Sequence, residues 1–494
     1  MRNDRRTFLK TAVGAPAILA AHSCSRPATP PNVLFILTDE WRAQATGYGG
    51  DPNVSTVNLD RFASESVNFS NAVSGLPVCC PYRGSLLTGQ YPLTHGVFVN
   101  DVELKPTGTT LGEAFENAGY ETGYIGKWHL YGSPGGQNER RLDYIPPDSR
   151  FGFQYWKACE CTHAYNHSLY YEGNDPEPKY WPGYDAIDQT EDACRFMEER
   201  SSTSDPFFLT LALGPPHFPL DTAPDRYKAL YEERDLQLRP NVPEEFREEA
   251  IADLRGYYAH IAALDDCLAR LLGTLESNGI AENTIVVFTA DHGDMMRSQG
   301  LRTKHVPWDE SIRIPFLLRY PQKLGNDGQD IRTVLNTPDI MPTLLGMAGL
   351  PVPDGVQGAD YTGLCMGEST PGDVAALLNF PVPFGVARPE GIAEYRGVRT
   401  ERYTYVRSIH GPWLLYDNET DPYQMQNLSG DSEHRELQDR LEGVLEAKLN
   451  EAGDEFLPAA EYISRAGLGH YREVTSAVDH VVSPWGDWES TLDE

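Results

Sequence analysis

The sequence is short of basic residues. Its 494 residues hold 41 lysines and arginines against 72 aspartates and glutamates, which gives a formal net charge of −31. Phosphate contacts need clustered basic side chains, so this balance excludes an ordinary nucleic-acid binder, and it equally excludes a polybasic membrane-surface protein. An anionic ligand therefore needs a local basic cluster that works against the field of the whole molecule.

Cysteine is also scarce, and long apolar runs are missing. Eight cysteines in a chain of this length do not form the dense disulfide framework of small secreted domains. Cys159 and Cys161 lack a second pair at zinc-finger spacing, which argues against a structural zinc. The composition, 40% hydrophobic and 11% aromatic, is nevertheless ample for a buried core.

The N-terminus carries a targeting pattern. Two adjacent arginines precede an apolar stretch at 11–21 that is too short to span a bilayer, although the same residues could also form an amphipathic helix. We interpret residues 1–23 as a twin-arginine export signal and the proline-rich residues 24–31 as a tether. Cys24 follows a lipoprotein-like cleavage site and is a candidate for lipid attachment. The sequence thus predicts export to the periplasm or cell surface of a bacterium, with a lipid anchor as its one membrane contact.

Three continuous apolar runs end in polar residues. They are Val33–Thr38, Phe207–Leu213 and Ile285–Thr289, and helical patterns lie between them, notably at 244–275. Buried strands that alternate with helices predict an α/β fold, in which a large mixed, mostly parallel sheet is sandwiched by helices. Ligands in such folds bind beyond the carboxyl ends of the strands.

The pattern changes near residue 370. Short half-exposed strands at Tyr395–Thr400 and Tyr403–Arg407 are followed by a charged helix around 436–450. We therefore assign residues 32–369 to the main α/β domain. Residues 370–494 are assigned to a smaller α+β subdomain with an antiparallel sheet.

One segment carries a specific chemical motif. Residues 79–89 read Cys-Cys-Pro-Tyr-Arg-Gly-Ser-Leu-Leu-Thr-Gly, the pattern C-x-P-x-R followed by two small residues and L-L-T-G. This segment resembles the signature of the type I sulfatases of the alkaline phosphatase superfamily. The resemblance implies that a maturation enzyme oxidises Cys79 to formylglycine (3-oxoalanine), whose hydrate is the nucleophile, and that Arg83 steadies it. Tyr82 stands where the family usually has a small polar residue.

The local chemistry agrees with that role. Pro81 favours the first turn of a helix, with Cys79 just before it, and free N–H groups at a helix start stabilise a developing anion. A plain Cys79 thiolate would also be activated there. An unmodified cysteine nucleophile and a purely structural buried cysteine therefore remain the alternatives.

The resemblance extends to a metal site. It implies one divalent cation, with calcium expected, held by modified Cys79 together with Asp39, Glu40, Asp291 and His292. Calcium prefers oxygen ligands. Glu40 stands where the family usually has Asp, and His292 where Asn is common. Without the Cys79 motif, carboxylates at strand ends are more simply interpreted as helix caps.

Further family elements supply cations, acids and bases. The G-K-W-H-L element implies that Lys127 holds the hydrate and the sulfate and that His129 is a base, and residues two apart on an extended segment point to one face. The P-H-x-P element implies that His217 protonates the leaving alcohol. Lys304 matches the lysine that clamps the sulfate.

The substrate is expected to be a glycan. Residues 155–184 are rich in aromatic side chains on which sugar rings stack, so we predict subsites there, with His163 and His167 as ligands. Alternatively, the aromatics only anchor a long loop. Arg396 and Arg399 are expected at the pocket rim.

The sequence therefore predicts a sulfatase that removes sulfate from a glycan fragment. One alternative is a phosphonate monoester hydrolase or phosphodiesterase of the same superfamily. The other is a non-catalytic glycan-binding lipoprotein in which Cys79 stays unmodified.

Overall fold

The structure, a computed structural model, describes residues 29–370, 372 and 374–475. The expected export signal, Cys24 and most of the tether lie outside these residues. None of the helices in the described part of the chain is both long and apolar enough to cross a membrane.

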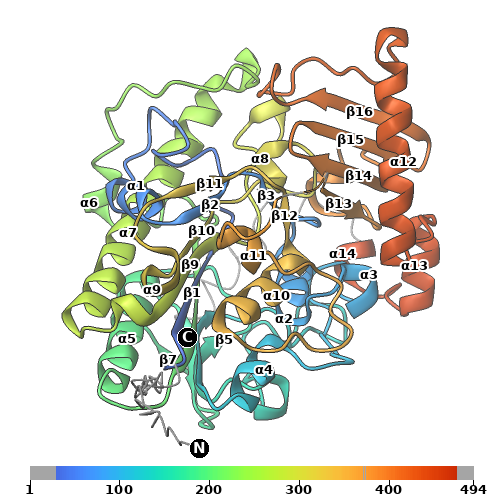
Figure 1. The fold of residues 1–494 in the computed structure, drawn as a ribbon. Helices are drawn as coiled ribbons and strands as arrows, with labels where there is room; N and C mark the ends of the chain where they lie inside the picture. Colours follow the sequence, from blue (N-terminus) through green and yellow to red (C-terminus); the bar gives the residue numbers. More distant parts are fainter. Residues whose placement is uncertain (1–28, 371, 373, 476–494) are drawn as a thin grey trace, which may run out of the picture.

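A ten-stranded mixed sheet forms the centre of the main domain, in the order β11-β2-β10-β9-β1-β8-β4-β5-β6-β7 (Figure 1). Strands β9, β1, β8 and β4 pair in parallel. Every residue of β8 and β9 is buried, which is why their sequences are continuous apolar runs. The predicted α/β sheet is confirmed. The strands are β1 (Asn32–Asp39), β2 (Val67–Phe69), β4 (Glu121–Lys127), β5 (Tyr155–Cys159), β6 (Leu169–Glu172), β7 (Lys179–Tyr180), β8 (Phe207–Pro216), β9 (Thr284–Ala290), β10 (Phe316–Arg319) and β11 (Gln329–Ile331).

Helices cover both faces of this sheet (Figure 1). Helices α5 and α7 pack together on one side, and α2 packs against α4 and α10 on the other. The main helices are α1 (Val57–Ser64), α2 (Cys79–Thr88), α4 (Leu111–Asn117), α5 (Asp185–Arg200), α7 (Arg247–Ser277) and α10 (Thr337–Ala348). The carboxyl ends of β1, β4, β8 and β9 consequently meet at one edge, which is where the polar residues that follow them come together.

A separate antiparallel sheet forms the C-terminal region, as predicted. Its strands run in the order β13-β14-β15-β16. Helix α12 packs on this sheet through Leu441, Leu445 and Leu449. The elements are β13 (Ala375–Phe380), β14 (Tyr395–Thr400), β15 (Tyr403–Ser408), β16 (Gly411–Asp417) and α12 (Arg435–Ala452). The backbone N–H of Asn379 in β13 donates to the carbonyl of Gly75, just ahead of α2, at 2.9 Å, so this sheet is joined directly to the site-bearing part of the chain.

Candidate active site

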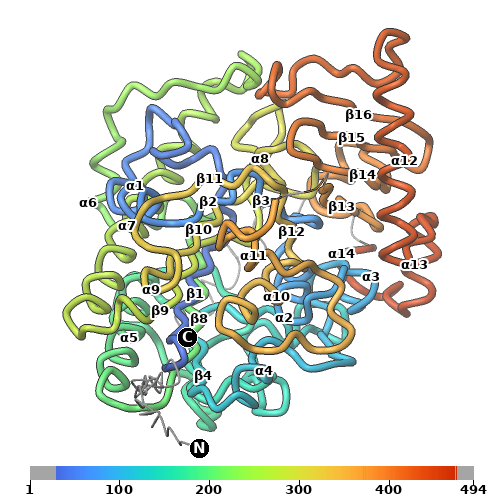
Figure 2. The backbone as a smooth tube through the Cα atoms, viewed as in Figure 1, coloured from blue at the N-terminus to red at the C-terminus, as the bar shows by residue number. Residues whose placement is uncertain are grey.

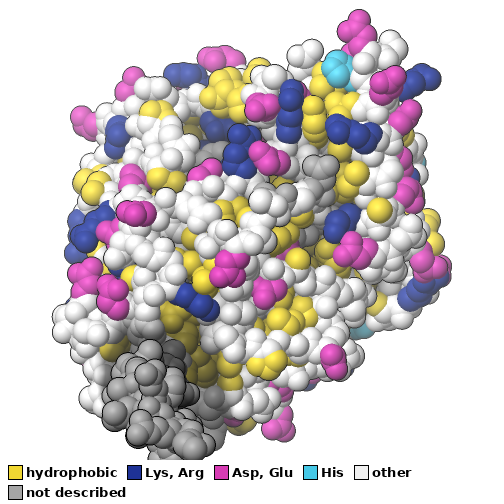
Figure 3. All heavy atoms as spheres, viewed as in Figure 1, with side chains coloured by type: hydrophobic (Ala, Val, Ile, Leu, Met, Phe, Trp, Pro, Cys, Tyr) yellow, Lys and Arg dark blue, Asp and Glu magenta, His cyan; other side chains and the backbone are white. Residues whose placement is uncertain are grey.

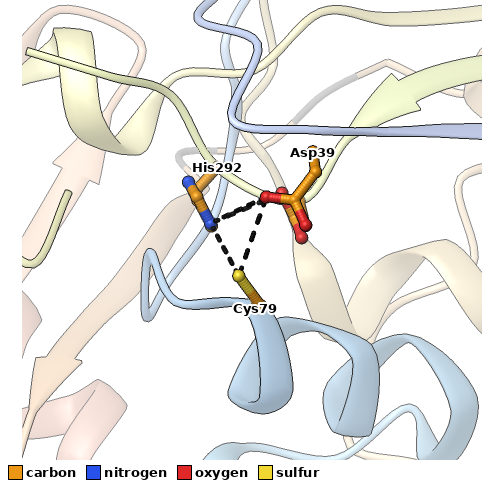
Figure 4. Close-up of side chains that lie close together, drawn as sticks. Asp39, Cys79 and His292 are labelled. Carbon is orange, nitrogen blue, oxygen red and sulfur yellow. Dashed lines mark hydrogen bonds and ion pairs between the residues drawn. The ribbon is translucent and has the colours of Figure 1, made fainter. Parts of the chain in front are cut away.

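Cys79 is the first residue of α2, which begins two residues earlier than its proline indicates. Its side chain is only 2% exposed. The Sγ atom lies 3.3 Å from His292 Nε2, 3.6 Å from Lys127 Nζ and 3.7 Å from Asp39 Oδ1. Figure 4 shows that Asp39 and His292 both point at this sulfur. A group attached to Cys79 is therefore held between a carboxylate, an imidazole and an ammonium at a helix N-terminus.

Two buried cations organise the carboxylates beside Cys79. Arg83 Nη2 lies 3.2 Å from Asp39 Oδ2 and 3.1 Å from Asp291 Oδ2, and Lys127 Nζ donates to Asp39 Oδ2 at 2.6 Å. Burial alone would raise the pKa of Asp39, but Lys127 and Arg83 outweigh it and hold that pKa well below its usual value. Burial and the charge of Asp39 raise the pKa of Asp291 to about 6.

The side chain of Glu40 contacts two further side chains of the site, those of Lys304 and His217. Its carboxylate lies 3.2 Å from both Lys304 Nζ and His217 Nε2. The residue is held in a left-handed conformation, φ 66°, by Tyr257, whose hydroxyl donates to the Glu40 carbonyl at 2.7 Å. Tyr257 is a structural support that nothing in its helical sequence context indicated.

Lys304 and His217 form one proton-sharing pair. Lys304 Nζ lies 2.7 Å from His217 Nε2, while His217 Nδ1 lies 2.9 Å from the carbonyl of Phe218. Since a carbonyl only accepts, Nδ1 carries a proton and Nε2 accepts one from Lys304. Burial and the Lys304 charge hold the pKa of His217 well below its usual value. At neutral pH the proton of the pair therefore belongs to Lys304 until an anion binds.

The predicted metal ligands converge. Among the described residues, ligand atoms of Asp39, Cys79, Asp291 and His292 all lie within 4.8 Å of one another, and so do those of Asp39, Glu40 and His217. His292 Nδ1 lies 3.0 Å from the carbonyl of Gly293, which leaves Nε2 as the lone-pair nitrogen turned toward the carboxylates. Three buried carboxylates and this imidazole are a donor set that fits a divalent cation.

Gly293 is required at that position by close packing. A Cβ added there would lie 2.0 Å from the carbonyl oxygen of Glu310. The small residue lets the His292 backbone turn into the site.

Contrary to the prediction, the side chain of His129 does not lie on the same face as that of Lys127. The backbone leaves the extended conformation at Gly126, φ 104°, and again at His129, φ 58°. Lys127 consequently reaches Asp39, whereas His129 Nε2 faces Asp101 Oδ1 at 3.6 Å. Arg141 holds Asp101 through two hydrogen bonds of 2.8 and 2.5 Å. Sequence reasoning missed Asp101, because no spacing or motif marks it.

The two candidate histidines of the aromatic stretch lie in different environments. His163 is buried in the site, with Nε2 3.4 Å from Lys127 Nζ and its ring 4.2 Å from that of His217. His167 is exposed and stacks on Tyr180 at 4.3 Å. Most aromatics of this stretch lie in the hydrophobic core or pack against it, which supports the anchoring interpretation. Those in the core are Trp156, Tyr165, Trp181 and Tyr184, and those packed against it are Tyr155 and Tyr170.

Arg396 and Arg399 do not lie at a pocket rim. Both are buried, at 0% and 2% exposed. Arg396 pairs with Asp454, and Arg399 Nε lies 3.1 Å from Asp309 Oδ1. The expected rim position is wrong, because both guanidiniums satisfy carboxylates inside the C-terminal region and at its junction with the main domain.

An Asp454→Ala variant should lose stability and keep its activity while folded. It leaves the Arg396 guanidinium buried without its carboxylate, which costs about 3–5 kcal/mol. Glu455→Ala is the matched control, since it removes an exposed partner of Arg465 and should cost about 0–1 kcal/mol. Denaturant unfolding of both variants measures the difference. Equal stability of the two would contradict a structural role for Arg396.

The acidic excess lies outside this cluster. Figure 3 shows aspartate and glutamate side chains spread over the surface of one face. Arg83, Lys127 and Lys304 are 1%, 3% and 5% exposed, so the basic groups are enclosed with the carboxylates. The local basic cluster that an anionic ligand requires is present.

This combination of fold and site defines a hydrolase of the alkaline phosphatase superfamily. The model of the sulfatase family matches residues 31–350, and that of the C-terminal region of N-sulphoglucosamine sulphohydrolase matches residues 298–451. The chain belongs to the sulfatase family.

Named relatives agree with this assignment. The chain is 44% identical over 439 residues to an ulvan-active sulfatase of Formosa agariphila, covering 88% of this chain and 84% of the relative. It is 30% identical over 508 residues to an endo-4-O-sulfatase of Bacteroides thetaiotaomicron, covering 90% and 97%. A solved structure from that organism, from work on the metabolism of multiple glycosaminoglycans, matches with a TM-score of 0.78 and 28% identity, covering 90% and 100%.

Proposed function

We propose that this sulfatase hydrolyses sulfate esters of a glycan, with oxidised Cys79 as the nucleophile and a divalent cation beside it. The observation that carries the proposal is the convergence of Cys79, Asp39, Lys127 and His292 at the start of α2. The names of the 44% and 30% identical relatives support the sulfate ester and the glycan. Sulfate release from position-defined sulfated mono- and disaccharides tests it.

The residues around Cys79 have different roles when the hydrate oxygen attacks the sulfur of the substrate. The hydrated aldehyde of formylglycine supplies the attacking hydroxyl. Asp291, whose carboxylate lies beside Arg83 and among the groups around Cys79, is the proposed acceptor of the proton of that hydroxyl. Lys127 and the free N–H groups of the first turn of α2 stabilise the negative charge that develops there.

The Lys304–His217 pair serves the leaving group. When a sulfate ester binds, its negative charge favours the doubly protonated pair, and His217 then delivers its Nε2 proton to the departing alcohol. Lys304 stays beside the sulfate oxygens. The match of residues 126–130 to the family element G-K-W-H-L supports His129 as the base for the second hydroxyl at Cys79, whose deprotonation expels sulfate; in the structure its Nε2 faces Asp101 Oδ1 at 3.6 Å.

The metal would be held by Asp39, Asp291, His292 and Glu40, and it would polarise the sulfate oxygens when bound. We expect a chelator to lower kcat by about 100-fold or more and to lower the melting temperature, because three buried carboxylates then repel one another. Calcium should restore both quantities. An active, equally stable protein after verified metal removal would contradict the site.

We also propose that residues 1–23 direct export to the periplasm or cell surface, that Cys24 carries a lipid, and that a formylglycine-generating enzyme acts on Cys79. The arginine pair, the short apolar run and the Cys79 motif support these three steps. Cell fractionation, labelling with a fatty acid against a Cys24→Ser control, and a mass spectrum of the Cys79 peptide test them separately.

Two alternatives to a sulfatase can be tested with the same protein. A phosphonate monoester hydrolase would cleave a phosphonate or phosphodiester faster than a sulfate ester, and the sulfatase names of the relatives speak against it. A glycan-binding lipoprotein would keep an unmodified Cys79 peptide in its native host.

A further inference from the structure

A second basic pocket lies beside the loop that follows β1. This cavity of about 460 Å³ is lined by residues of the segments 42–53, 237–242 and 422–423, together with residues of α7 and the chain after β9. The first two segments are tied together at Asn53, whose side chain donates to the carbonyl of Gln237 at 2.9 Å and accepts from its N–H at 2.8 Å. Figure 2 shows the course of the backbone through these parts of the chain. We call this cavity the arginine pocket.

Three arginines and one aspartate are the charged residues that line it: Arg42, Arg239, Arg313 and Asp51. Arg239 pairs with Glu310 at 3.0 Å, and Arg313 approaches Asp309 at 3.5 Å. Asp51 accepts from the Tyr258 hydroxyl at 2.7 Å. Among the described residues, Arg239, Arg313 and Asp51 thus have hydrogen-bond or ion-pair partners, whereas Arg42 has no such direct partner and only the more distant charges of Asp51 and Glu310 act on it.

Arg42 forms the buried floor of the arginine pocket. It is 2% exposed, and its Nε and Nη1 atoms have no hydrogen-bond partner in the described part of the chain. Its backbone is fixed, because its N–H donates to the Tyr257 hydroxyl at 2.9 Å and Gly293 packs on its Cβ. These two buried nitrogens are donors without an acceptor, which is unfavourable, and an anion in the pocket would supply one.

The exposure of the lining residues gives that anion a way in. Gly50 and Pro240 at the rim are exposed, whereas Tyr258 and Met296 at the floor are buried. A pocket with an open rim and a fixed, unpartnered guanidinium at its base is organised before its ligand arrives, and such pre-organisation lowers the cost of binding.

We propose that the arginine pocket binds a sulfate group, with Arg42 at its base and Arg239 and Arg313 at its sides. Guanidinium forks match tetrahedral oxyanions in two-pronged hydrogen bonds. The choice of sulfate over other oxyanions rests on the sulfatase family, which makes sulfate the product and a sulfated molecule the substrate.

The arginine pocket adjoins a cavity that reaches the neighbours of two catalytic residues. Met296 also lines a larger cavity of about 880 Å³, whose lining includes Phe218 and Thr303, the neighbours of His217 and Lys304. The bound group is accordingly either a second sulfate ester of a glycan that reaches past the catalytic site or the free sulfate ion released there.

Thermal unfolding in sodium sulfate and in sodium chloride of equal ionic strength tests the pocket without any need for activity. Sulfate also stabilises proteins non-specifically. The decisive quantity is therefore the difference between the wild type, Arg42→Met and Arg61→Gln, a control on an arginine whose side chain is 72% exposed. We expect Arg42→Met to be at least as stable as the wild type in chloride, because an unpaired buried charge is replaced by an apolar chain.

In sulfate, the wild type and Arg61→Gln should gain stability over chloride at about tenfold lower concentration than Arg42→Met. Arg239→Gln should show the same weakened response, and it keeps the test valid if Arg42→Met does not fold. An identical sulfate response in all variants, or a loss of stability in Arg42→Met that is the same in both salts, would overturn the proposal.

Kinetics then separate the two sources of the sulfate group. If it is a second ester, Arg42→Met should raise KM about tenfold for a disulfated saccharide and leave KM unchanged for its monosulfated counterpart. If it is the free ion, both KM values should stay unchanged while the weakened thermal response persists. Either pattern supports the site, and a failed glycan screen would leave the thermal result intact.

Discussion

A Cys79→Ser variant should release at most one equivalent of alcohol per protein molecule and then stop. Serine offers a single hydroxyl, so once that oxygen has taken the sulfate no second hydroxyl is left to expel it. The remaining route is slow attack by water on a buried ester. We expect multiple-turnover kcat to fall by about 10⁴-fold or more, as when other enzymes lose their nucleophile.

Intact mass spectrometry should show the stalled variant heavier by one SO₃ group at residue 79. Cys80→Ala is the matched control, because Cys80 is equally buried in the same helix, whereas its sulfur accepts from the N–H of Asp101 at 3.3 Å and lies beside His129. That control should keep formylglycine and retain kcat within about tenfold. Full turnover by Cys79→Ser would exclude the hydrate mechanism.

A His217→Ala variant should show a loss that depends on the leaving group. For a sugar sulfate, whose alkoxide is a poor leaving group, removal of the proton donor should lower kcat by about 10²–10⁴-fold. For 4-nitrophenyl sulfate the loss should be far smaller, because the phenolate departs without protonation. The ratio of kcat values for the two substrates is the measurement.

His167→Ala supplies the control for that experiment, since this histidine is exposed and stacks only on Tyr180 among the described contacts. It should leave both rates unchanged. An equal loss on both substrates in His217→Ala would assign His217 to sulfate binding instead of proton transfer. A loss confined to the sugar sulfate establishes its role as the acid.

The strands that carry the site were predictable because a strand that is buried on both faces has a continuous apolar sequence. Residues 33–38, 207–213 and 285–289 are continuous apolar runs, and each is a central strand in the structure. The residues just after such strands had to meet at one edge. That reasoning predicts that Asp39, Asp291 and the expected acid His217 lie near one another.

The sequence could not show how these residues pair. The partnership of Lys304 with Glu40 and His217 joins residues far apart in the chain, and the turn of His129 toward Asp101 depends on two positive φ values. Arg396 was misplaced for a similar reason. An arginine in a half-exposed pattern looks like a surface residue unless its partner, Asp454, is known to fold over it.

Because the chain is synthesised from its N-terminus, the contact between β13 and the start of α2 can form only late in synthesis. Gly75 and Tyr91, on either side of α2, are held by Asn379 and by the apolar residues of β13. About 300 residues separate Cys79 from this strand, which a ribosome adding roughly 5–20 residues per second needs about 15–60 s to complete. During that interval α2, which begins at Cys79, lacks the contacts that β13 makes with the residues on either side of it. We therefore expect the thiol of Cys79 to be more accessible to chemical conversion during synthesis than after the C-terminal sheet has packed against these flanking residues.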